Sequence, residues 1–163
     1  MAEGEFVRRL GEVGYGRDNG HMGVLDLLAR AGLSIPEGVV LNRQAHEEYL
    51  RTSGALRDIR SAARRREDAR RQAAEIRSRH ASYRVEGGLN RAICEALTGL
   101  NARAVVVLSE DFEKSGLRSI PEVKAAVRDA WLSLRGLERQ VEAASQGEDF
   151  PTWPVMVYSQ AKI

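Results

Sequence analysis

The stretch that does most to decide the fold is residues 20–42, which read Gly-His-Met-Gly-Val-Leu-Asp-Leu-Leu-Ala-Arg-Ala-Gly-Leu-Ser-Ile-Pro-Glu-Gly-Val-Val-Leu-Asn. Its first glycines predict a loop that opens a helix over about residues 22–31, and Gly32 is the natural end of that helix. Pro36 prevents continuation, and the apolar run at residues 39–41 predicts a buried strand. This order places a helix N-terminus, with its free backbone N–H groups, beside a strand, which is a common way of holding an anion.

Helical patterns dominate the next part of the chain. Asn42 is predicted to cap a helix over about residues 43–50. Residues 54–83 are helical in pattern but poorly apolar, with a thin alanine-rich stripe that needs a partner surface. Gly87 and Gly88 end that pattern, and a stronger helix is predicted over residues 89–100. The segment 54–100 is therefore expected to form an arginine-rich helical hairpin.

The remaining part holds the most regular patterns. Residues 104–108 are a continuous apolar run and predict a strand. Ser119 and Glu122 form a capping box with a proline in the first turn, and one apolar face then continues as far as Val141, so we expect one core helix. Residues 155–160 alternate as a final strand. The expected architecture is α+β, with three or four strands and about five helices in one domain spanning residues 1–163.

Composition limits the class of protein. The chain has 163 residues, 43% apolar and 29% charged, which suits one ordinary globular domain. It has no apolar run long enough to span a bilayer, and the first residues lack the layout of a signal peptide. The single cysteine, Cys94, cannot form an internal disulfide. We therefore expect a cytoplasmic protein with no membrane partner.

Residues 20–42 resemble the opening of the nucleotide-binding domain of the pyruvate phosphate dikinase and phosphoenolpyruvate synthase family. The family motif is Gly-Gly-Lys-Gly, followed by a leucine-bearing helix, Ala-Gly, and a Pro-x-Gly step into a strand. An ungapped match places residues 19–22 on that motif, with residues 31–32 and 36–38 in step. The resemblance implies an ATP-grasp N-terminal-subdomain-like fold, a short mixed sheet packed by helices, and ATP with magnesium as possible cofactors.

By the same resemblance, the nucleotide-binding residues would be Gly20, His21, Met22 and Ser109. His21 stands at the position of the family lysine that contacts phosphates, and an unperturbed histidine carries its charge only in part at neutral pH. Leu108 stands where the family has a phosphate-binding arginine, and leucine cannot neutralise a phosphate. The chain is therefore expected to lack autonomous phosphotransferase activity, and we assign no catalytic or metal-binding residue.

Two further segments match the family. Trp131 to Leu134 resembles a helix segment of packing residues, and residues 155–160 resemble a strand after which the full enzymes continue into the second half of the ATP-grasp fold. In those enzymes the second half supplies the adenine pocket and the magnesium carboxylates. A partner chain carrying that half is therefore expected. Glu110 and Asp111 could hold a metal ion, but two carboxylates specify little, and we favour solvated loop residues.

The arginine-rich segment allows another interpretation. Ten arginines lie between Arg57 and Arg84 and could line a nucleic-acid backbone. Interspersed carboxylates favour intrahelical ion pairs, and no aromatic residues alternate with the arginines, so a solvated hairpin is favoured. His46 and His80 have no ligand spacing to each other, and neither they nor Cys94 are expected to be catalytic.

The sequence therefore predicts a partial or degenerate nucleotide-binding domain of the dikinase type. Such a domain would act with a partner chain or bind nucleotide weakly. The alternative is a non-catalytic protein-interaction or scaffolding module. A nucleic-acid-binding protein that uses the arginine-rich helix is a third, less favoured, possibility.

Overall fold

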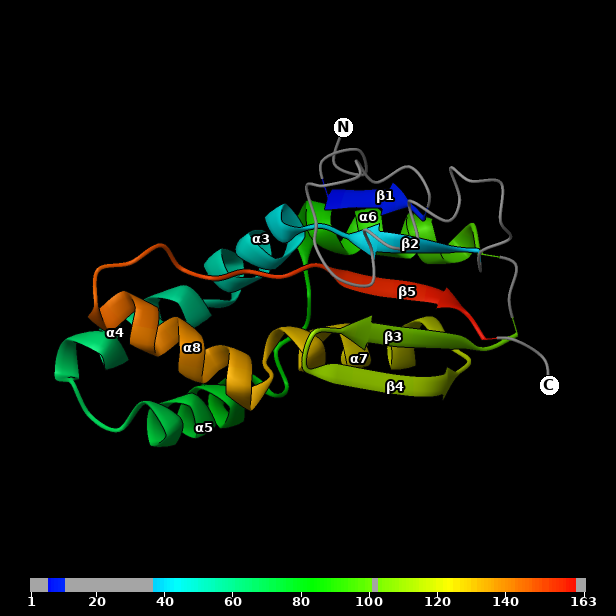
Figure 1. Cartoon of the computed structure of the whole chain (residues 1–163). Helices are drawn as coiled ribbons and strands as arrows, with labels where there is room; N and C mark the ends of the chain where they lie inside the picture. Colours follow the sequence, from blue (N-terminus) through cyan, green and yellow to red (C-terminus); the bar gives the residue numbers. More distant parts are fainter. Residues whose placement is uncertain (1–5, 11–36, 101–102, 161–163) are drawn as a thin grey trace, which may run out of the picture.

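The computed structural model describes residues 6–10, 37–100 and 103–160 (Figure 1). These residues form an α+β fold, which confirms the predicted class. The strands are β1 (Val7–Arg9), β2 (Gly38–Leu41), β3 (Val105–Ser109), β4 (Phe112–Leu117) and β5 (Val155–Ser159). The helices are α3 (Arg43–Ser53), α4 (Ala55–Arg65), α5 (Ala69–His80), α6 (Gly87–Thr98), α7 (Ile120–Trp131) and α8 (Leu134–Ser145).

The five described strands form one sheet in the order β1-β2-β5-β3-β4. Each pair of neighbours is antiparallel, so the prediction of a mixed sheet is wrong for this part of the chain. The reason lies in β5, which enters between β2 and β3 and runs opposite to both. Its Val157 is paired with Val39 on one side and Val107 on the other.

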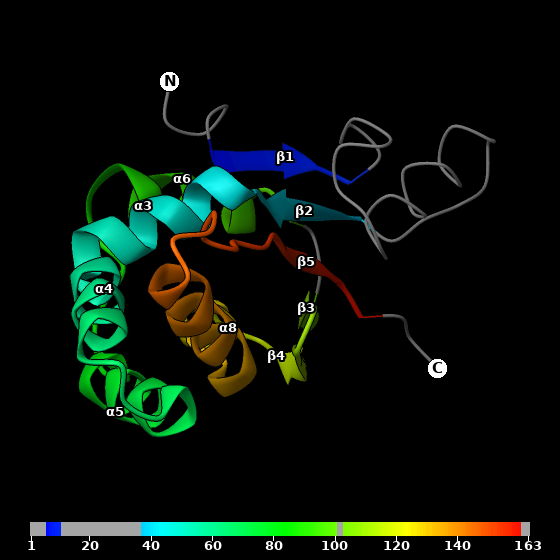
Figure 2. The ribbon, with the colours of Figure 1, turned by 60° about the vertical axis from the view of Figure 1, so that its left-hand side comes forward.

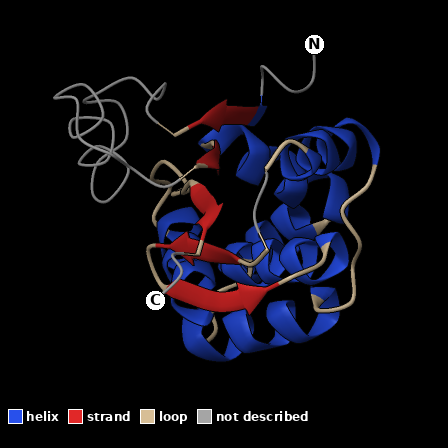
Figure 3. Cartoon of the chain, turned by 90° about the vertical axis from the view of Figure 1, so that its right-hand side faces the viewer, coloured by secondary structure: helices blue, strands red, loops and turns tan. Residues whose placement is uncertain are grey.

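Successive side chains of each strand point to opposite faces of the sheet, and both faces carry apolar residues. One face contributes Val39, Val107 and Val157 to the main core. Helices α3, α6 and α7 contact the strands (Figure 1), and Figure 3 shows the strands as a curved band with the helices gathered beside it. The other face carries a small second cluster, in which Val40 and Met156 are buried. The predicted alternation of residues 155–160 is thus confirmed.

A second group of helices lies beyond one end of the sheet. Helices α4 and α5 pack side by side, and α8 packs against both of them (Figure 2). Helix α4 ends at Arg65, and Arg66 adopts a left-handed conformation with φ of 52°. Helix α5 then begins after Asp68, whose side chain accepts a hydrogen bond from Arg70 N. The expected hairpin over residues 54–100 is thus three helices, α4, α5 and α6, and we call α4, α5 and the tight turn between them the arginine-rich hairpin.

The predicted single core helix after Ser119 is in fact two helices. Helix α7 ends at Trp131, and α8 begins at Leu134 with Ser133 as its N-cap. The Ser133 side chain accepts a hydrogen bond from Gly136 N at 3.2 Å. The apolar pattern continues across the break because Trp131 and Leu132 are themselves fully buried. Periodicity alone therefore could not reveal the break.

Both predicted helix caps are confirmed. Asn42 Oδ1 accepts a hydrogen bond from Ala45 N at 3.0 Å at the start of α3. Ser119 Oγ accepts a hydrogen bond from Glu122 N at 3.3 Å and donates one to Glu122 Oε1 at 3.0 Å at the start of α7. Within the described ranges, none of the helices has the length and apolar character needed to cross a bilayer.

Candidate functional site

The resemblance places nucleotide-binding residues at two points of the chain. Gly20, His21 and Met22 lie outside the described residues. The second point is the end of β3, where Ser109 closes the strand and Glu110 and Asp111 form the turn into β4. The geometry of that turn therefore decides what the described part of the candidate site can do.

Ser109 points into the protein interior. The residue is buried, and its hydroxyl donates a hydrogen bond to the Pro154 carbonyl oxygen at 3.2 Å. This bond joins the end of β3 to the segment that leads into β5. The Ser109 hydroxyl, which the resemblance assigns to nucleotide binding, thus has a structural role.

Leu108 lies on the opposite face of β3. Leu108 and Tyr158 both pack against the second apolar cluster, which consists of Val40 and Met156. Burial raises the pKa of the Tyr158 phenol, and the nearby Glu113 carboxylate adds to the rise. The position that holds an arginine in the resembled family is therefore an apolar site in this chain.

Arg139 of α8 brings a positive charge to the turn after β3. Its Nη2 atom lies 3.0 Å from Asp111 Oδ2 and 3.4 Å from Glu110 Oε2. The Asp111 side chain is 20% exposed and the Glu110 side chain 61% exposed. Both residues lie in the turn and are exposed, as expected, although the Asp111 side chain is also held by an ion pair with Arg139.

The turn has an unfavourable charge for a phosphate. One guanidinium faces two carboxylates, which leaves a net negative charge beside the end of β3. Among the described residues there is also no group of three or more histidine, cysteine, aspartate or glutamate side chains arranged to hold a metal ion. The ion pairs of Arg139 instead tie α8 to the sheet.

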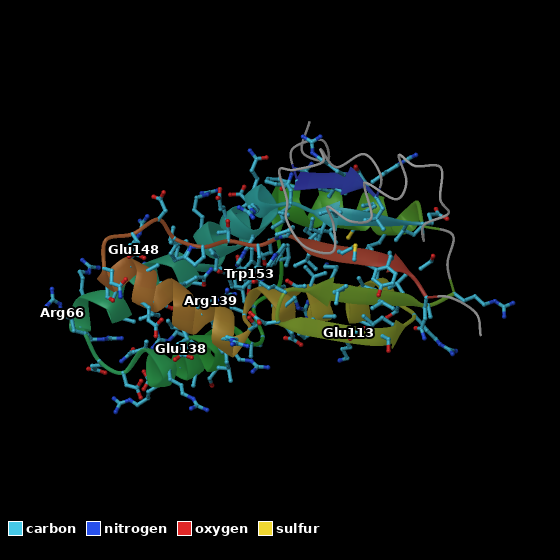
Figure 4. All side chains as sticks on the ribbon, in the orientation of Figure 1. Arg66, Glu113, Glu138, Arg139, Glu148 and Trp153 are labelled. Carbon is cyan, nitrogen blue, oxygen red and sulfur yellow. The ribbon has the colours of Figure 1, made fainter. Side chains whose placement is uncertain are left out.

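The Arg139 guanidinium also lies over the Trp153 ring, 5.9 Å from its centroid. Figure 4 shows the two residues where α8 approaches the sheet. Trp153 is itself fixed by two hydrogen bonds, because its backbone N–H donates to His46 Nδ1 at 3.1 Å and its indole N–H donates to the Ala130 carbonyl at 3.2 Å. The sequence pattern did not single out Trp153, because it lies in an irregular segment.

His46 has a structural role in the core. Its ring is fully buried and stacks on Trp131, with ring centroids 5.9 Å apart and an interplanar angle of 6°. Burial lowers its pKa from the ordinary 6.5 to about 3, although backbone groups of Trp131 and Trp153 partly oppose the change. His46 is therefore a neutral hydrogen-bond acceptor. Its position beside Ala45, on the buried face predicted for that helix, is a signal that could have indicated this role.

The other described histidine, His80, joins α5 to α4. Its Nε2 atom lies 2.6 Å from Asp58 Oδ2, and Arg79 Nη1 approaches the same oxygen at 3.3 Å. Burial alone would raise the pKa of Asp58, but the hydrogen bonds from His80 and Arg79 outweigh it and lower that pKa. The cluster therefore holds the hairpin closed.

A cleft of about 450 Å³ opens among α4, the α4–α5 turn and α8. It is lined by Ala62, Ala63, Arg66, Glu67, Ala69, Val141, Glu142 and Ser145. None of these residues belongs to the turn after β3. The cleft is therefore separate from the site that the resemblance indicates.

Comparison with known proteins adds no assignment to this geometry. No model of a protein family matches the chain, and no curated protein matches it significantly. The likeness to the dikinase family therefore rests on the motif residues of the chain itself.

Proposed function

We propose that this chain is a degenerate nucleotide-binding domain of the dikinase type, which acts by assembling with a partner chain and does not itself transfer phosphate. The observation that carries the proposal is the charge at the end of β3. Leu108 occupies the position of the family arginine, and Arg139, the nearby cation, is already paired with Asp111 and Glu110.

Phosphoryl transfer depends on positioning and on neutralising the charge of the phosphates. A site that presents leucine and a net negative turn loses much of that neutralisation. In the resembled enzymes the adenine pocket and the magnesium carboxylates come from the second half of the ATP-grasp fold. A partner that carries this half would have to supply both functions.

The test is calorimetric titration of ATP with magnesium into four proteins. They are the native chain, Leu108→Arg, the double variant His21→Lys with Leu108→Arg, and the control Ser115→Arg. Leu108 is half-buried next to Tyr158, so the aliphatic stem of an arginine can lie along that ring while its guanidinium reaches solvent. Ser115 is exposed on β4 and adds the same charge outside the candidate site.

We expect no binding by the native chain or the control and a gain of binding by the double variant. Micromolar binding by the native chain would contradict the proposed degeneration. ATP-dependent phosphorylation by the native chain would contradict the absence of catalysis. If none of the proteins binds, the dikinase-type assignment fails and the alternative, a protein-interaction or scaffolding module, replaces it.

A further inference from the structure

The arginine-rich hairpin carries far more positive charge than the chain as a whole. Ten arginines and four carboxylates lie between residues 57 and 84, whereas the net charge of all 163 residues is +2. The rest of the molecule must therefore be acidic on balance. Such segregation of charge is typical of a surface that attracts a polyanion.

The four carboxylates of the hairpin do little to neutralise its arginines. Asp58 is engaged with His80 as well as Arg79. Glu67 and Glu75 share a single arginine, Arg71. The fourth, Asp68, caps α5. The expected pairing at helical spacing is present at Arg71, but among the described ion pairs the four carboxylates hold only two of the ten arginines.

Three of the remaining arginines, Arg57, Arg60 and Arg64, are exposed and form what we call the arginine face of α4. None of the three takes part in an ion pair within the described part of the chain. Their spacing of three and four residues puts them on one side of the helix, opposite the buried Ile59 and Ala62. Figure 2 shows α4 at the outer edge of the molecule, away from the sheet.

The length of this face fits a phosphate backbone. From Arg57 to Arg64 the helix rises about 10.5 Å, at ~1.5 Å per residue. Phosphates along one strand of a duplex are spaced about 3.4 Å apart along the axis, so the face covers about three phosphate spacings. Arg66 continues the positive charge to the tip of the hairpin, where Figure 4 shows its side chain pointing away from the molecule.

The chemistry of the face favours a nucleic acid over a protein or a membrane. Protein interfaces have an apolar core, and membrane-binding helices insert apolar side chains. Among the described residues, Leu134 on α8 is the large hydrophobic side chain that is exposed, and α4 has none. Because this face has arginines but no exposed apolar or aromatic side chain, it can bind phosphate groups without recognising the base sequence.

We propose that the arginine face of α4 binds the phosphodiester backbone of a nucleic acid without sequence preference. This activity is independent of the proposed nucleotide-binding role. It uses the side of α4 that lies opposite the buried Ile59 and Ala62, whereas Ser109, which the resemblance assigns to nucleotide binding, lies at the turn between β3 and β4.

The test is fluorescence anisotropy with a labelled 20-base-pair DNA duplex, titrated with the native chain over a series of salt concentrations. The test variant replaces Arg57, Arg60 and Arg64 with glutamine. The matched control makes the same replacement at Arg91, Arg103 and Arg118, which are exposed in other parts of the chain. Far-UV circular dichroism and urea unfolding verify that both variants fold like the native chain.

We expect the native chain to bind the duplex with a steep dependence on salt. Losing three phosphate contacts should lower the slope of log K against log salt by about 2.7 and weaken binding at least about tenfold at low salt. The control should bind like the native chain. The proposal is overturned if the native chain does not bind at 50 mM salt, or if the control loses as much affinity as the test variant. It is also overturned if poly-glutamate or anionic lipid vesicles bind through the same arginines as tightly as the duplex.

Discussion

Lowering the pH should destabilise this protein through one buried side chain, His46. In the folded chain the Nδ1 atom of His46 accepts a hydrogen bond from Trp153 N, and burial lowers its pKa from 6.5 to about 3. The folded state therefore prefers the neutral ring more strongly than the unfolded state does. The resulting stabilisation is complete above pH 6.5, decreases as the pH falls toward 3, and decreases no further below that.

The size of the effect follows from the two pKa values. Between pH 8 and pH 5, about 1.5 pH units lie below the unfolded pKa, and each is worth ~1.36 kcal/mol, so His46 should remove about 2 kcal/mol from the free energy of unfolding. With a urea m-value of about 2 kcal/mol per molar, the unfolding midpoint should fall by about 1 M. Urea unfolding followed by tryptophan fluorescence at the two pH values measures this directly.

The matched control is His46→Asn, in which the amide oxygen can accept the Trp153 N–H bond but does not titrate in this range. The variant should be less stable overall, because the smaller side chain leaves space beside Trp131. Its unfolding midpoint should nevertheless change by about 1 M less between the two pH values than that of the native chain. Equal pH dependence in the two proteins would refute the assignment of a buried, neutral His46.

Three other substitutions, two of them with a control variant, test the structure around α7 and α8. Gly136→Ala should lower the free energy of unfolding by about 1–3 kcal/mol, because an added Cβ would overlap the Trp153 ring and lie 2.7 Å from the N-cap hydroxyl of α8. Gly99→Ala is the control and should be neutral or stabilising, since its Cβ would meet nothing closer than 3.5 Å. Ser119→Ala should cost about 1 kcal/mol by removing the cap of α7, whereas Ser119→Asp should retain most of the stability. Trp153→Phe should cost about 2–4 kcal/mol, because it leaves the buried Ala130 carbonyl without its indole donor and removes part of a buried ring. Urea unfolding reads out all of these changes, and a stable Gly136→Ala protein would show that the loop carrying Trp153 can move aside.

The elements that the sequence predicts well are those with local causes. Asn42 and Ser119 cap helices through hydrogen bonds to residues three positions further on, so the sequence itself contains both partners. Most of the run at residues 104–108 lies in β3, which spans Val105–Ser109, because its side chains suit a pleated, buried environment. In each case the contacts that decide the structure lie within a few residues.

The elements that it predicts poorly depend on partners far along the chain. The break at Leu132 and Ser133 is hidden because the apolar pattern continues through it. Strand direction depends on how β5 enters the sheet, and no local pattern encodes that choice. In the candidate site, Arg139 lies 28 residues from Asp111, so neither residue indicates the ion pair alone. Trp153 and His46 are 107 residues apart, and their contact likewise has no local signature.

The position of β5 has a consequence for synthesis on the ribosome. It is the last strand of the described chain, yet it lies at the centre of the sheet and separates β1 and β2 from β3 and β4. Until residues 155–159 emerge, both β2 and β3 present an unpaired edge to other nascent chains. The complete sheet can therefore form only after residues 155–159 are available, through pairings distant in sequence, which form slowly and leave strand edges open to misassembly in the meantime.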